Sequence, residues 1–477
     1  MKNLEEFQPI HIVGIGGIGM SAIAEVLHDR GIEVRGSDLK DGVNARRLAA
    51  KGISVAIGHV PENIEGAGLV VLSSAVKAGN PELVAARAAG LPVWSRADML
   101  ARLMDNFKAI SVTGTHGKTT TTSLIAWIFE SAGLDPTVIT GGIINDWGTN
   151  ARIGKGEWIV VEADESDETF VKLPTRIGVV TNIDPEHLDY YGSVEAMYGA
   201  YRRFFEGIQP GGVVVAGIDH PMVRRFAADA RLTAGSRILR YGVAADADIR
   251  LTAVRSNGGS MHVDAALNDE VEGGERTLID LTLAIPGQYN ALNAMAAIAV
   301  ATEAGIDDAT IREALSSFHG VKRRFTRTGI WNGVAFYDDY AHHPAEISAV
   351  LGAARGASKG RVIAIVQPHR YSRLKSLFDE FCGCFGDSDT VIVTPVYSAG
   401  EEPNGVDRDA LIAGVRKTGH RQVIGVDGEE ALTSLVASLV KPGDLVIGLG
   451  AGTITDWANA LPGRLDLLSP SRLDAAE

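Results

Sequence analysis

Residues 109–120 read AISVTGTHGKTT, an apolar run that leads directly into a loop rich in glycine and threonine. Residues 121–130 then keep a helical spacing of apolar side chains, so the stretch predicts a strand, a loop and a helix. Backbone N–H groups of such a loop can surround phosphates, a lysine can reach them, and a hydroxyl can hold magnesium. The usual Walker pattern has glycine at the position of Val112, so we interpret the loop as a short variant. The stretch therefore predicts an α/β fold with a phosphate-binding loop around Lys118.

Short apolar runs alternate with helical patterns along most of the chain, which is typical of βαβ units and mainly parallel sheets. Residues 246–280 are richer in Thr, Asn, Gly and alternating apolar positions, which indicates an antiparallel insert with a turn at Asn257-Gly258-Gly259. A helical pattern resumes over residues 291–304, and Gly305 is suited to ending it. We expect further strands near residues 11–13, 33–35, 69–72, 158–161, 177–180, 334–337, 362–366, 390–393 and 445–448.

The length of 477 residues is too great for one hydrophobic core and suggests about three domains. We predict a Rossmann-like N-terminal domain over residues 1–106 and a central domain over residues 107–320. The central domain should have a parallel sheet of the P-loop ATPase type with the antiparallel insert. A second Rossmann-like domain should follow over residues 321–477.

The composition is that of an ordinary globular protein, with 45% hydrophobic and 22% charged residues. A formal net charge of −14 argues against nucleic acid or an anionic membrane as a partner, because both require a basic surface. Cys382 and Cys384 have no second pair to complete a zinc site, so we interpret them as reduced thiols. Neither an export signal nor an apolar run of about 18 residues is present, so we expect a cytoplasmic protein.

A second glycine pattern lies near the N-terminus. Gly14, Gly16 and Gly19 form GxGxxG between a predicted strand and a predicted helix, and Asp38 follows 19 residues after Gly19. In dinucleotide-binding folds the glycines let the backbone approach a diphosphate, and the acid accepts a hydrogen bond from a ribose. The pattern alone leaves open NAD(P), another diphosphate ligand, or a purely structural tight turn.

Hard oxygen ligands follow two of the predicted central strands. Because the carboxyl ends of parallel strands are where α/β sheets bind ligands, these side chains should converge on the loop of Lys118. Magnesium prefers carboxylates and substrate oxygens, which suits Glu162. His187 taken alone would more often be a hydrogen-bonded structural histidine. The two groups are Glu162, Asp164, Glu165 and Asp167, and then Asn182, Asp184, Glu186, His187 and Asp189.

Further polar motifs lie in the second half of the chain. Asn290 and Asn293 begin a predicted helix, where an N-cap and a surface amide are the ordinary roles. Arg370 and Arg373, three residues apart on one predicted helix face, can capture a carboxylate or phosphate, although surface salt bridges are the alternative. Two more groups follow or precede strands: Arg323 with Arg324, and the run Asp338, Asp339, Tyr340, Ala341, His342, His343 and Pro344.

Taken together, these motifs resemble the Mur ligases. The match includes GIGGIGM, GSDL and SSAV in the first predicted domain, and GTHGKTTTT, EADESD and TNIDPEHLD in the second. RRF, DDYAHHP, PHRYSRL and LGAG complete it in the third. The resemblance therefore runs nearly from end to end.

The resemblance implies an ATP-dependent ligase that joins L-alanine to the lactyl carboxylate of UDP-N-acetylmuramate during peptidoglycan precursor synthesis. An acyl phosphate is the implied intermediate, ATP and two Mg²⁺ ions are the implied cofactors, and only small-molecule partners are implied. The nearest alternative within the family is a recycling ligase that joins a preformed tripeptide to the same UDP-sugar. A dehydrogenase would rest on GxGxxG alone, and a non-catalytic nucleotide switch would leave the ligand-rich strand ends unexplained.

By the same resemblance, catalysis is assigned to Lys118, Glu162, His187 and Arg324. One metal ion is assigned to Thr119 and Glu162, and the other to His187. The UDP-sugar is assigned to Gly14, Gly16, Gly17, Gly19, Asp38, Ser73 and Ser74. ATP is assigned to Gly114, Thr115, His116, Gly117, Lys118, Thr119, Thr120, Asn290, Asn293, Arg324, Asp339 and His342. The amino acid is assigned to Tyr340, Arg370 and Arg373.

The chain departs from the family pattern in two places. Tyr289 stands where the family usually has histidine before the first asparagine of the adenine segment, and Gln288 replaces the common Arg or His. Sister ligases carry a lysine, modified to a carbamate, shortly after the EHLD-type motif, but residues 187–207 contain no lysine. We therefore expect the second Mg²⁺ to be held by His187, substrate oxygens and water.

Overall fold

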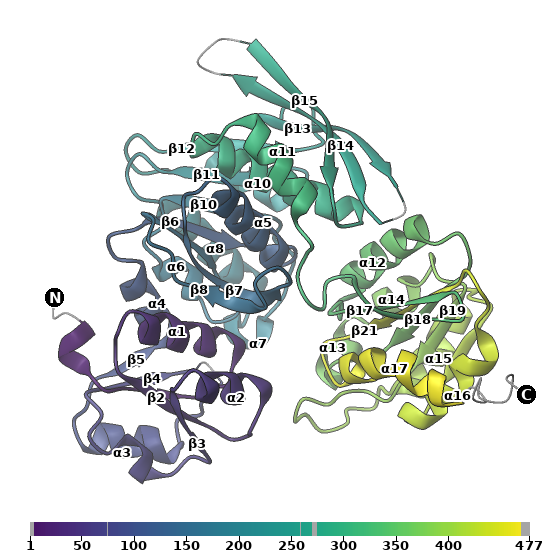
Figure 1. Ribbon diagram of the computed structural model, residues 1–477, viewed down its shortest axis with the longest axis horizontal. Helices are drawn as coiled ribbons and strands as arrows, with labels where there is room; N and C mark the ends of the chain where they lie inside the picture. Colours follow the sequence, from purple (N-terminus) through teal and green to yellow (C-terminus); the bar gives the residue numbers. More distant parts are fainter. Residues whose placement is uncertain (1–3, 74, 258, 270–273, 469–477) are drawn as a thin grey trace, which may run out of the picture. The chain divides into compact units, whose positions relative to one another are not determined.

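A computed structural model describes residues 4–73, 75–257, 259–269 and 274–468, which form three sheets (Figure 1). The chain divides into two compact units. Unit 1 comprises Met1–Ala253, Val263–Leu281 and Leu292–His319, and unit 2 comprises Val254–His262, Thr282–Ala291 and Gly320–Glu477. Two positions singled out by the sequence, Ser74 and Gly258, lie outside the described residues. In the part that is described, no helix is long and apolar enough to cross a membrane.

The first sheet of unit 1 has the strand order β3-β2-β1-β4-β5, with all neighbours parallel. This order agrees with the Rossmann-like fold predicted for the N-terminal region. The buried strand β1 leads into α1 through the glycine pattern, as predicted. The strands are β1 (Ile10–Val13), β2 (Val34–Asp38), β3 (Ser54–Ile57), β4 (Leu69–Leu72) and β5 (Val93–Ser95). The helices are η1 (Leu4–Phe7), α1 (Ile18–Asp29), α2 (Val43–Ala50), η2 (Pro61–Ile64), α3 (Pro81–Ala88) and α4 (Arg96–Met104).

The second sheet has ten strands in the described residues, in the order β15-β14-β13-β12-β11-β10-β6-β9-β7-β8. Strand β6 lies between β10 and β9, and both pairs are parallel, so three strand ends meet beside the loop of Lys118. The strands are β6 (Lys108–Thr113), β7 (Thr137–Ile144), β8 (Thr149–Arg152), β9 (Trp158–Glu162), β10 (Ile177–Val180), β11 (Val213–Gly217) and β12 (Arg237–Gly242). The helices are α5 (Lys118–Ser131), α6 (Thr169–Lys172), α7 (Leu188–Tyr191), α8 (Val194–Glu206) and α9 (Pro221–Asp229).

The predicted insert extends this sheet as β13 (Ile249–Ser256), β14 (Met261–Asp269) and β15 (Gly274–Leu283). Four positions separate β13 from β14 and four separate β14 from β15, too few for a parallel crossover, so both connections join antiparallel strands. Helix α10 (Gln288–Glu303) begins three residues before the predicted start, and α11 (Asp308–Ser317) follows it. Gly305 has a φ of 79° just after α10, in agreement with its predicted role.

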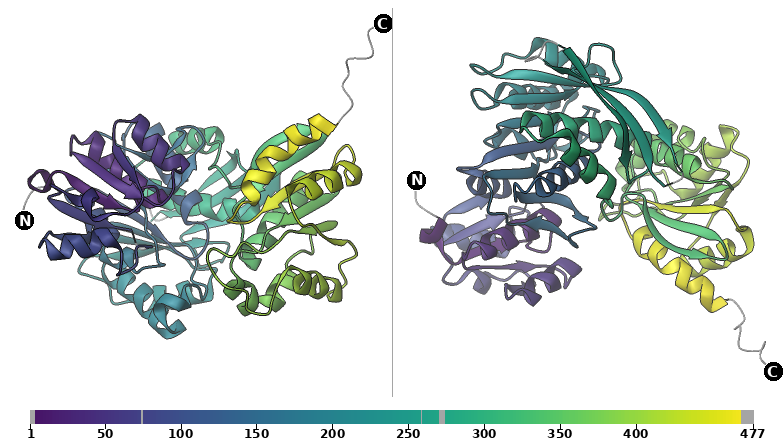
Figure 2. Two further views of the ribbon diagram at one scale, coloured as in Figure 1. Left: turned by 90° about the horizontal axis from the view of Figure 1, so that it is seen from below. Right: turned by 45° about the horizontal axis from the view of Figure 1, so that its top comes forward.

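The third sheet, in unit 2, has the order β16-β17-β21-β18-β19-β20, and only β16 is antiparallel to its neighbour among the described strands. Alternate residues of β18 enter two apolar clusters, so both faces of the sheet are covered, as the helices on either side of it show (Figure 2). The strands are β16 (Thr326–Trp331), β17 (Val334–Asp339), β18 (Val362–Val366), β19 (Thr390–Val393), β20 (Val423–Gly425) and β21 (Leu445–Leu449). The helices are α12 (Pro344–Ala357), α13 (Tyr371–Ser376), α14 (Phe378–Gly383), α15 (Arg408–Lys417), α16 (Glu429–Leu439) and α17 (Ile454–Leu468).

Candidate functional site

The loop between β6 and α5 requires glycine at two positions. Gly114 and Gly117 have φ values of 127° and 84°, which side chains rarely tolerate. A Cβ on Gly114 would also lie 2.2 Å from Thr181 Oγ1, and one on Gly117 would lie 2.6 Å from Asn293 Oδ1. The structure therefore brings Asn293 to the loop, as the sequence-based assignment requires.

Lys118, the first residue of α5, is turned back into this loop. Its Nζ donates to the carbonyl oxygens of Gly114 at 2.6 Å and Thr115 at 3.0 Å, and to Glu165 Oε1 at 2.8 Å. Burial would lower the lysine pKa, but Glu165 and the neighbouring carboxylates outweigh burial and raise it. An ammonium ion is thus held where an incoming phosphate would meet the loop.

The segment that follows the neighbouring strand β10 holds the rest of the loop. The N–H of His116 donates to Asn182 Oδ1 at 2.7 Å, and Asn182 Nδ2 donates back to the carbonyl oxygen of His116 at 3.0 Å. The N–H of Asp184 donates to Thr115 Oγ1 at 2.8 Å. These bonds preform the loop without using Lys118.

A hydroxyl and a carboxylate lie together at the start of α5. Thr119 Oγ1 donates to Glu162 Oε1 at 3.1 Å, while Glu162 Oε2 accepts from Thr140 Oγ1 at 3.1 Å and from the N–H of Gly141 at 2.6 Å. The pair predicted to bind the first metal ion is therefore in contact, and its donor set suits magnesium.

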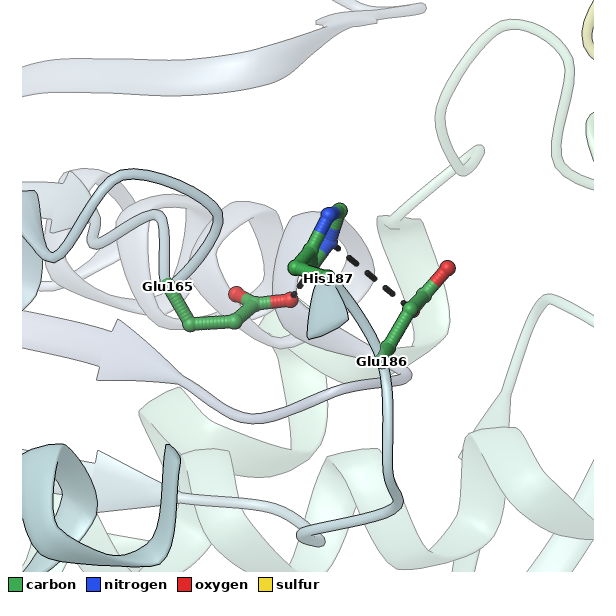
Figure 3. Close-up of side chains that lie close together, drawn as sticks. All are labelled: Glu165, Glu186 and His187. Carbon is green, nitrogen blue, oxygen red and sulfur yellow. Dashed lines mark ion pairs between the residues drawn. The ribbon is translucent and has the colours of Figure 1, made fainter. Parts of the chain in front are cut away.

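His187 belongs to a separate cluster. Its Nε2 lies 3.7 Å from Glu165 Oε1 and 3.9 Å from Glu186 Oε2 (Figure 3). One ligand atom from each of the three residues lies within 4.8 Å of the others, close enough to share one cation. Glu165 is 3% exposed, and its Oε2 has no hydrogen-bond partner. A bound cation would satisfy that oxygen, because buried carboxylates are otherwise paired.

The glycine pattern of the N-terminal sheet is folded as the sequence predicts. The N–H of Gly16 donates to Asp38 Oδ2 at 2.9 Å, and a Cβ on Gly16 would lie 2.9 Å from the same oxygen. Gly14 has a φ of 79° and lies against Ser73. A Cβ on Gly19 would lie 3.3 Å from Arg96 Nη1. Five of the seven predicted UDP-sugar residues thus meet at one loop, namely Gly14, Gly16, Gly17, Asp38 and Ser73.

In unit 2, Asp339 is a buried anchor for the segment that carries Arg324. Its carboxylate accepts from the N–H groups of Phe325 and Ala341, both at 2.7 Å. Burial raises the pKa of Asp339 to about 6, although Arg324 acts in the opposite direction. The Arg324 guanidinium lies 5.2 Å from the ring centre of Tyr340, and the Tyr340 and His342 rings meet edge to face at 5.1 Å. Four of the predicted residues thus form one cluster in this unit.

Arg370 and Arg373 lie at the start of α13 and within it, but they contact different partners. Arg370 Nε lies 3.9 Å from Glu401 Oε1, whereas Arg373 Nη1 lies 3.2 Å from His369 Nδ1. Asn290 Nδ2 donates to the carbonyl oxygen of Pro286 at 2.6 Å, within the first turn of α10. Tyr289, the residue that departs from the family pattern, packs against the apolar core of unit 2.

Three polar residues of the central site were not assigned roles from the sequence. Glu165 and Glu186 were noted only as candidate ligands, yet both face His187. His220 follows β11 and lies 3.3 Å from Asp184 Oδ1, while His116 Nε2 lies 3.4 Å from Asp184 Oδ2. The rule that ligand-binding side chains follow parallel strands would have identified His220.

Comparison with known proteins gives consistent matches along the chain. Residues 9–108 match the model described as "Mur ligase family, catalytic domain", residues 112–301 the "Mur ligase middle domain", and residues 323–452 the "Mur ligase, glutamate ligase domain". The UDP-N-acetylmuramate–L-alanine ligase of Parvibaculum lavamentivorans is 57% identical over 98% of this chain and 95% of its own length. That of Methylobacterium radiotolerans is 55% identical over 98% and 99%. The crystal structure of a UDP-N-acetylmuramate–alanine ligase from Thermotoga maritima covers 96% of this chain and 99% of its own, with a TM-score of 0.81 and 28% identity.

Proposed function

The chain belongs to the Mur ligase family, and we propose that it joins L-alanine to the lactyl carboxylate of UDP-N-acetylmuramate with ATP, in peptidoglycan precursor synthesis. The observation that carries the proposal is full-length identity of about 55% to ligases with that name, together with a buried Lys118 in a glycine loop beside two groups of carboxylates. The full-length similarity supports this reaction over that of the recycling ligase. A cytoplasmic location stays a prediction.

The proposed roles in unit 1 concern the two nucleotides. The loop from Gly114 to Thr120 binds the ATP phosphates, with Lys118 on the γ-phosphate and Asn293 near the adenine. One Mg²⁺ ion is held by Thr119 and Glu162, and the other by His187 together with Glu165 and Glu186. When bound, the ions offset negative charge during phosphoryl transfer. The UDP-sugar binds through Gly14, Gly16, Gly17 and Gly19 at its diphosphate, and through Asp38, Ser73 and Ser74 at its uridine.

The proposed roles in unit 2 concern the amino acid, the transferred phosphate and the ribose of ATP. Arg324 donates to the transferred phosphate, while Asp339 and His342 line the nucleotide ribose together with Asn290 of α10. Tyr340, Arg370 and Arg373 receive L-alanine. Arg370 faces Glu401 and Arg373 faces His369, and because a guanidinium carries five N–H donors, each can also bind the carboxylate of alanine.

The reaction follows from these positions. An oxygen of the lactyl carboxylate attacks the γ-phosphorus of ATP, the bond to the β-phosphate oxygen breaks, and ADP leaves. The alanine amine then attacks the acyl carbon, loses a proton, and inorganic phosphate departs as the amide forms. Lys118 and Arg324 hold charge on the transferred group throughout, and no enzyme nucleophile is needed.

Phosphate release should be measured with UDP-N-acetylmuramate, ATP and each amino acid in turn, and with the tripeptide in place of the amino acid. We expect release with L-alanine. Release only with the tripeptide would favour the recycling ligase. NAD-dependent oxidation without phosphate release would favour a dehydrogenase, and ATP binding that never responds to alanine would favour a non-catalytic switch.

A further inference from the structure

Arg96 connects the two glycine loops of unit 1. It is the first residue of α4, and the preceding Ser95 caps that helix in a reciprocal pair of bonds with Asp98, so the backbone at Arg96 is fixed. The side chain reaches the loop that follows β9, which lies 68 residues further along the chain. Its side chain is 17% exposed. The sequence-based roles given above do not include this residue.

All the hydrogen bonds that the Arg96 guanidinium makes to described residues come from one nitrogen, Nη2. Nη2 lies 2.9 Å from Asp164 Oδ2, 3.0 Å from Asp167 Oδ2 and 3.4 Å from Thr169 Oγ1. Nε is buried without a partner. An arginine carries five N–H donors, so most of this charged group's hydrogen-bonding capacity is unused.

The unused side of the guanidinium lies at the glycine loop of the N-terminal sheet. A Cβ on Gly19 would be 3.3 Å from Arg96 Nη1 and 3.7 Å from its Cδ, so the arginine passes directly beside the start of α1. Under the proposed function, this glycine loop binds the diphosphate of the UDP-sugar. A guanidinium with free donors at that point can form paired bonds to phosphate oxygens.

The occupied side of the guanidinium leads to the ATP loop. Asp164 and Asp167, which bind Arg96, flank Glu165 in sequence, and Glu165 Oε1 accepts from Lys118 Nζ at 2.8 Å. Tyr191 Oη also donates to the carbonyl oxygen of Glu165, so this short loop is held from several sides. Movement of Asp164 or Asp167 would therefore shift Glu165, the carboxylate that pairs with Lys118.

Resting on the proposed function, we propose that Arg96 binds the diphosphate of the UDP-sugar and couples that event to ATP binding at Lys118. The diphosphate binds donors that Asp164 and Asp167 leave unused, and its negative charge weakens the pairing of the same guanidinium with the two carboxylates. Because the two carboxylates lie on the loop of Glu165, a change in their pairing with Arg96 changes the hold of Glu165 on Lys118. Such coupling is reciprocal, so ATP must change the affinity for the UDP-sugar by the same factor.

The test measures UDP-N-acetylmuramate binding by calorimetry, with and without a non-hydrolysable ATP analogue and Mg²⁺. In the unaltered protein we expect the analogue to change the affinity, and coupling factors in proteins are typically about 5- to 150-fold. Arg96→Ala should weaken UDP-sugar binding roughly 10- to 100-fold, the usual value of a bond to a charged group, and should bring the coupling factor close to one. Arg96→Lys keeps a positive charge beside Asp164 and should lose the same coupling, because an ammonium cannot span both sides.

Arg47 provides a matched control. Its Nη2 donates to Asn150 Oδ1 at 2.7 Å, so it also joins the N-terminal sheet region to the central one, but away from Lys118. Arg47→Ala should leave the coupling factor unchanged. Asp167→Asn should reduce coupling while UDP-sugar affinity is kept or raised, because the link from Arg96 to the Glu165 loop is weakened and a negative charge near the diphosphate is removed.

The outcomes separate this inference from the function on which it rests. If the unaltered protein binds UDP-N-acetylmuramate and Arg96→Lys, folded by thermal unfolding, keeps both affinity and coupling, the inference is wrong and the proposed function stands. Loss of affinity with unchanged coupling would also overturn it, because Arg96 would then be a ligand alone. A protein that binds no UDP-N-acetylmuramate would overturn both.

Discussion

The loop after β1 and the loop after β6 follow the same backbone plan. Each connects a buried parallel strand to a helix, and in each a polar side chain at or just after the end of a neighbouring strand of the sheet accepts a loop N–H. Asp38 accepts from Gly16 at 2.9 Å, and Asn182 accepts from His116 at 2.7 Å. Both loops also favour glycine because a side-chain oxygen lies too close for a Cβ. Asp38 Oδ2 would be 2.9 Å from a Cβ on Gly16, and Asn293 Oδ1 would be 2.6 Å from one on Gly117.

The loops differ in the charged side chains that lie near them. The second contains Lys118 and faces Glu162, Glu165 and His187, which can hold cations and neutralise phosphate. The first has no lysine among residues 14–19, and its charged neighbour, Arg96, comes from α4. Under the proposed function, the same strand–loop–helix plan serves binding in one place and phosphoryl transfer in the other, and the difference lies in the side chains at the strand ends.

The largest expected effect is on Lys118→Ala, which removes the cation from the second loop. Phosphate release should fall by about 10³-fold or more, because loss of one transition-state donor typically costs 10²- to 10³-fold and this donor also binds ground-state ATP. UDP-N-acetylmuramate binding should change little. Lys172→Ala, which removes an exposed ion pair with Asp98, is the control. Equal loss of both functions in a folded variant would contradict the division of roles between the loops.

Glu82 is expected to stabilise the two strands that flank the first loop, because it bonds to His11 of β1 and Ser37 of β2. Burial would raise its pKa, but bonds from His11, Ser37 and Asn63 lower it to about 2. A carboxyl whose pKa is lower in the folded state stabilises the protein above the unfolded pKa of 4.5, and this stabilisation is lost as the pH falls toward 2. The shift corresponds to roughly 3 kcal/mol.

Glu82→Gln should therefore unfold more readily than the unaltered protein near neutral pH, and the difference should shrink as the pH is lowered from 5 toward 3. Urea unfolding at several pH values measures this difference. Glu62→Gln, at an exposed carboxylate of η2, should show no such trend. A difference that stays constant with pH would mean that the charge of Glu82 does not stabilise the domain.

The sequence predicted the parts of both loops that depend on local pattern. Strands β4, β10, β18 and β19 begin and end at the predicted residues, because each is a short apolar run between polar residues. The pairing of Arg96 with Asp164 could not be predicted, because it depends on how α4 packs against α6 across 68 residues of chain. The cluster at His187 was predicted only in part, because Glu165 comes from the separate loop after β9 and His187 has a left-handed backbone, with a φ of 56°, which the sequence pattern does not indicate.

A smaller effect is expected from Gly117→Ala. The methyl group would meet Asn293 Oδ1 at 2.6 Å, and the left-handed backbone at φ 84° adds about 1–2 kcal/mol. Affinity for ATP should fall roughly 10- to 30-fold, measured with a fluorescent ATP analogue. Gly133→Ala has a similar φ of 71° and open space around the Cβ, and it lies after the far end of α5, so it is the control that should leave ATP binding unchanged. If both variants bind ATP equally well, the close approach of Asn293 does not matter for the loop.

The smallest expected effect is none at all, and it concerns the second Mg²⁺ ion that we propose beside the second loop. Sister ligases resembling this chain use a carbamate on a lysine that residues 187–207 do not contain. Here Glu165 and Glu186 already bring carboxylate oxygens to His187, so the carbamate oxygens have a replacement. Lys118 does contact Glu165, but its raised pKa keeps the amine protonated, and only the neutral amine can add carbon dioxide.

Arg203 cannot take the part of the missing lysine, because it is paired with Glu168 and a guanidinium stays protonated. The rate of phosphate release should therefore be the same in buffer freed of carbon dioxide and in buffer with added bicarbonate. A sister ligase that carries the lysine, assayed in parallel, should lose activity in the first buffer and regain it in the second. Glu165→Gln should weaken Mn²⁺ binding measured by spin resonance, and bicarbonate should not restore it. Stimulation by bicarbonate, or a carbamate signal from labelled bicarbonate on any lysine, would show that carboxylates do not replace the carbamate here.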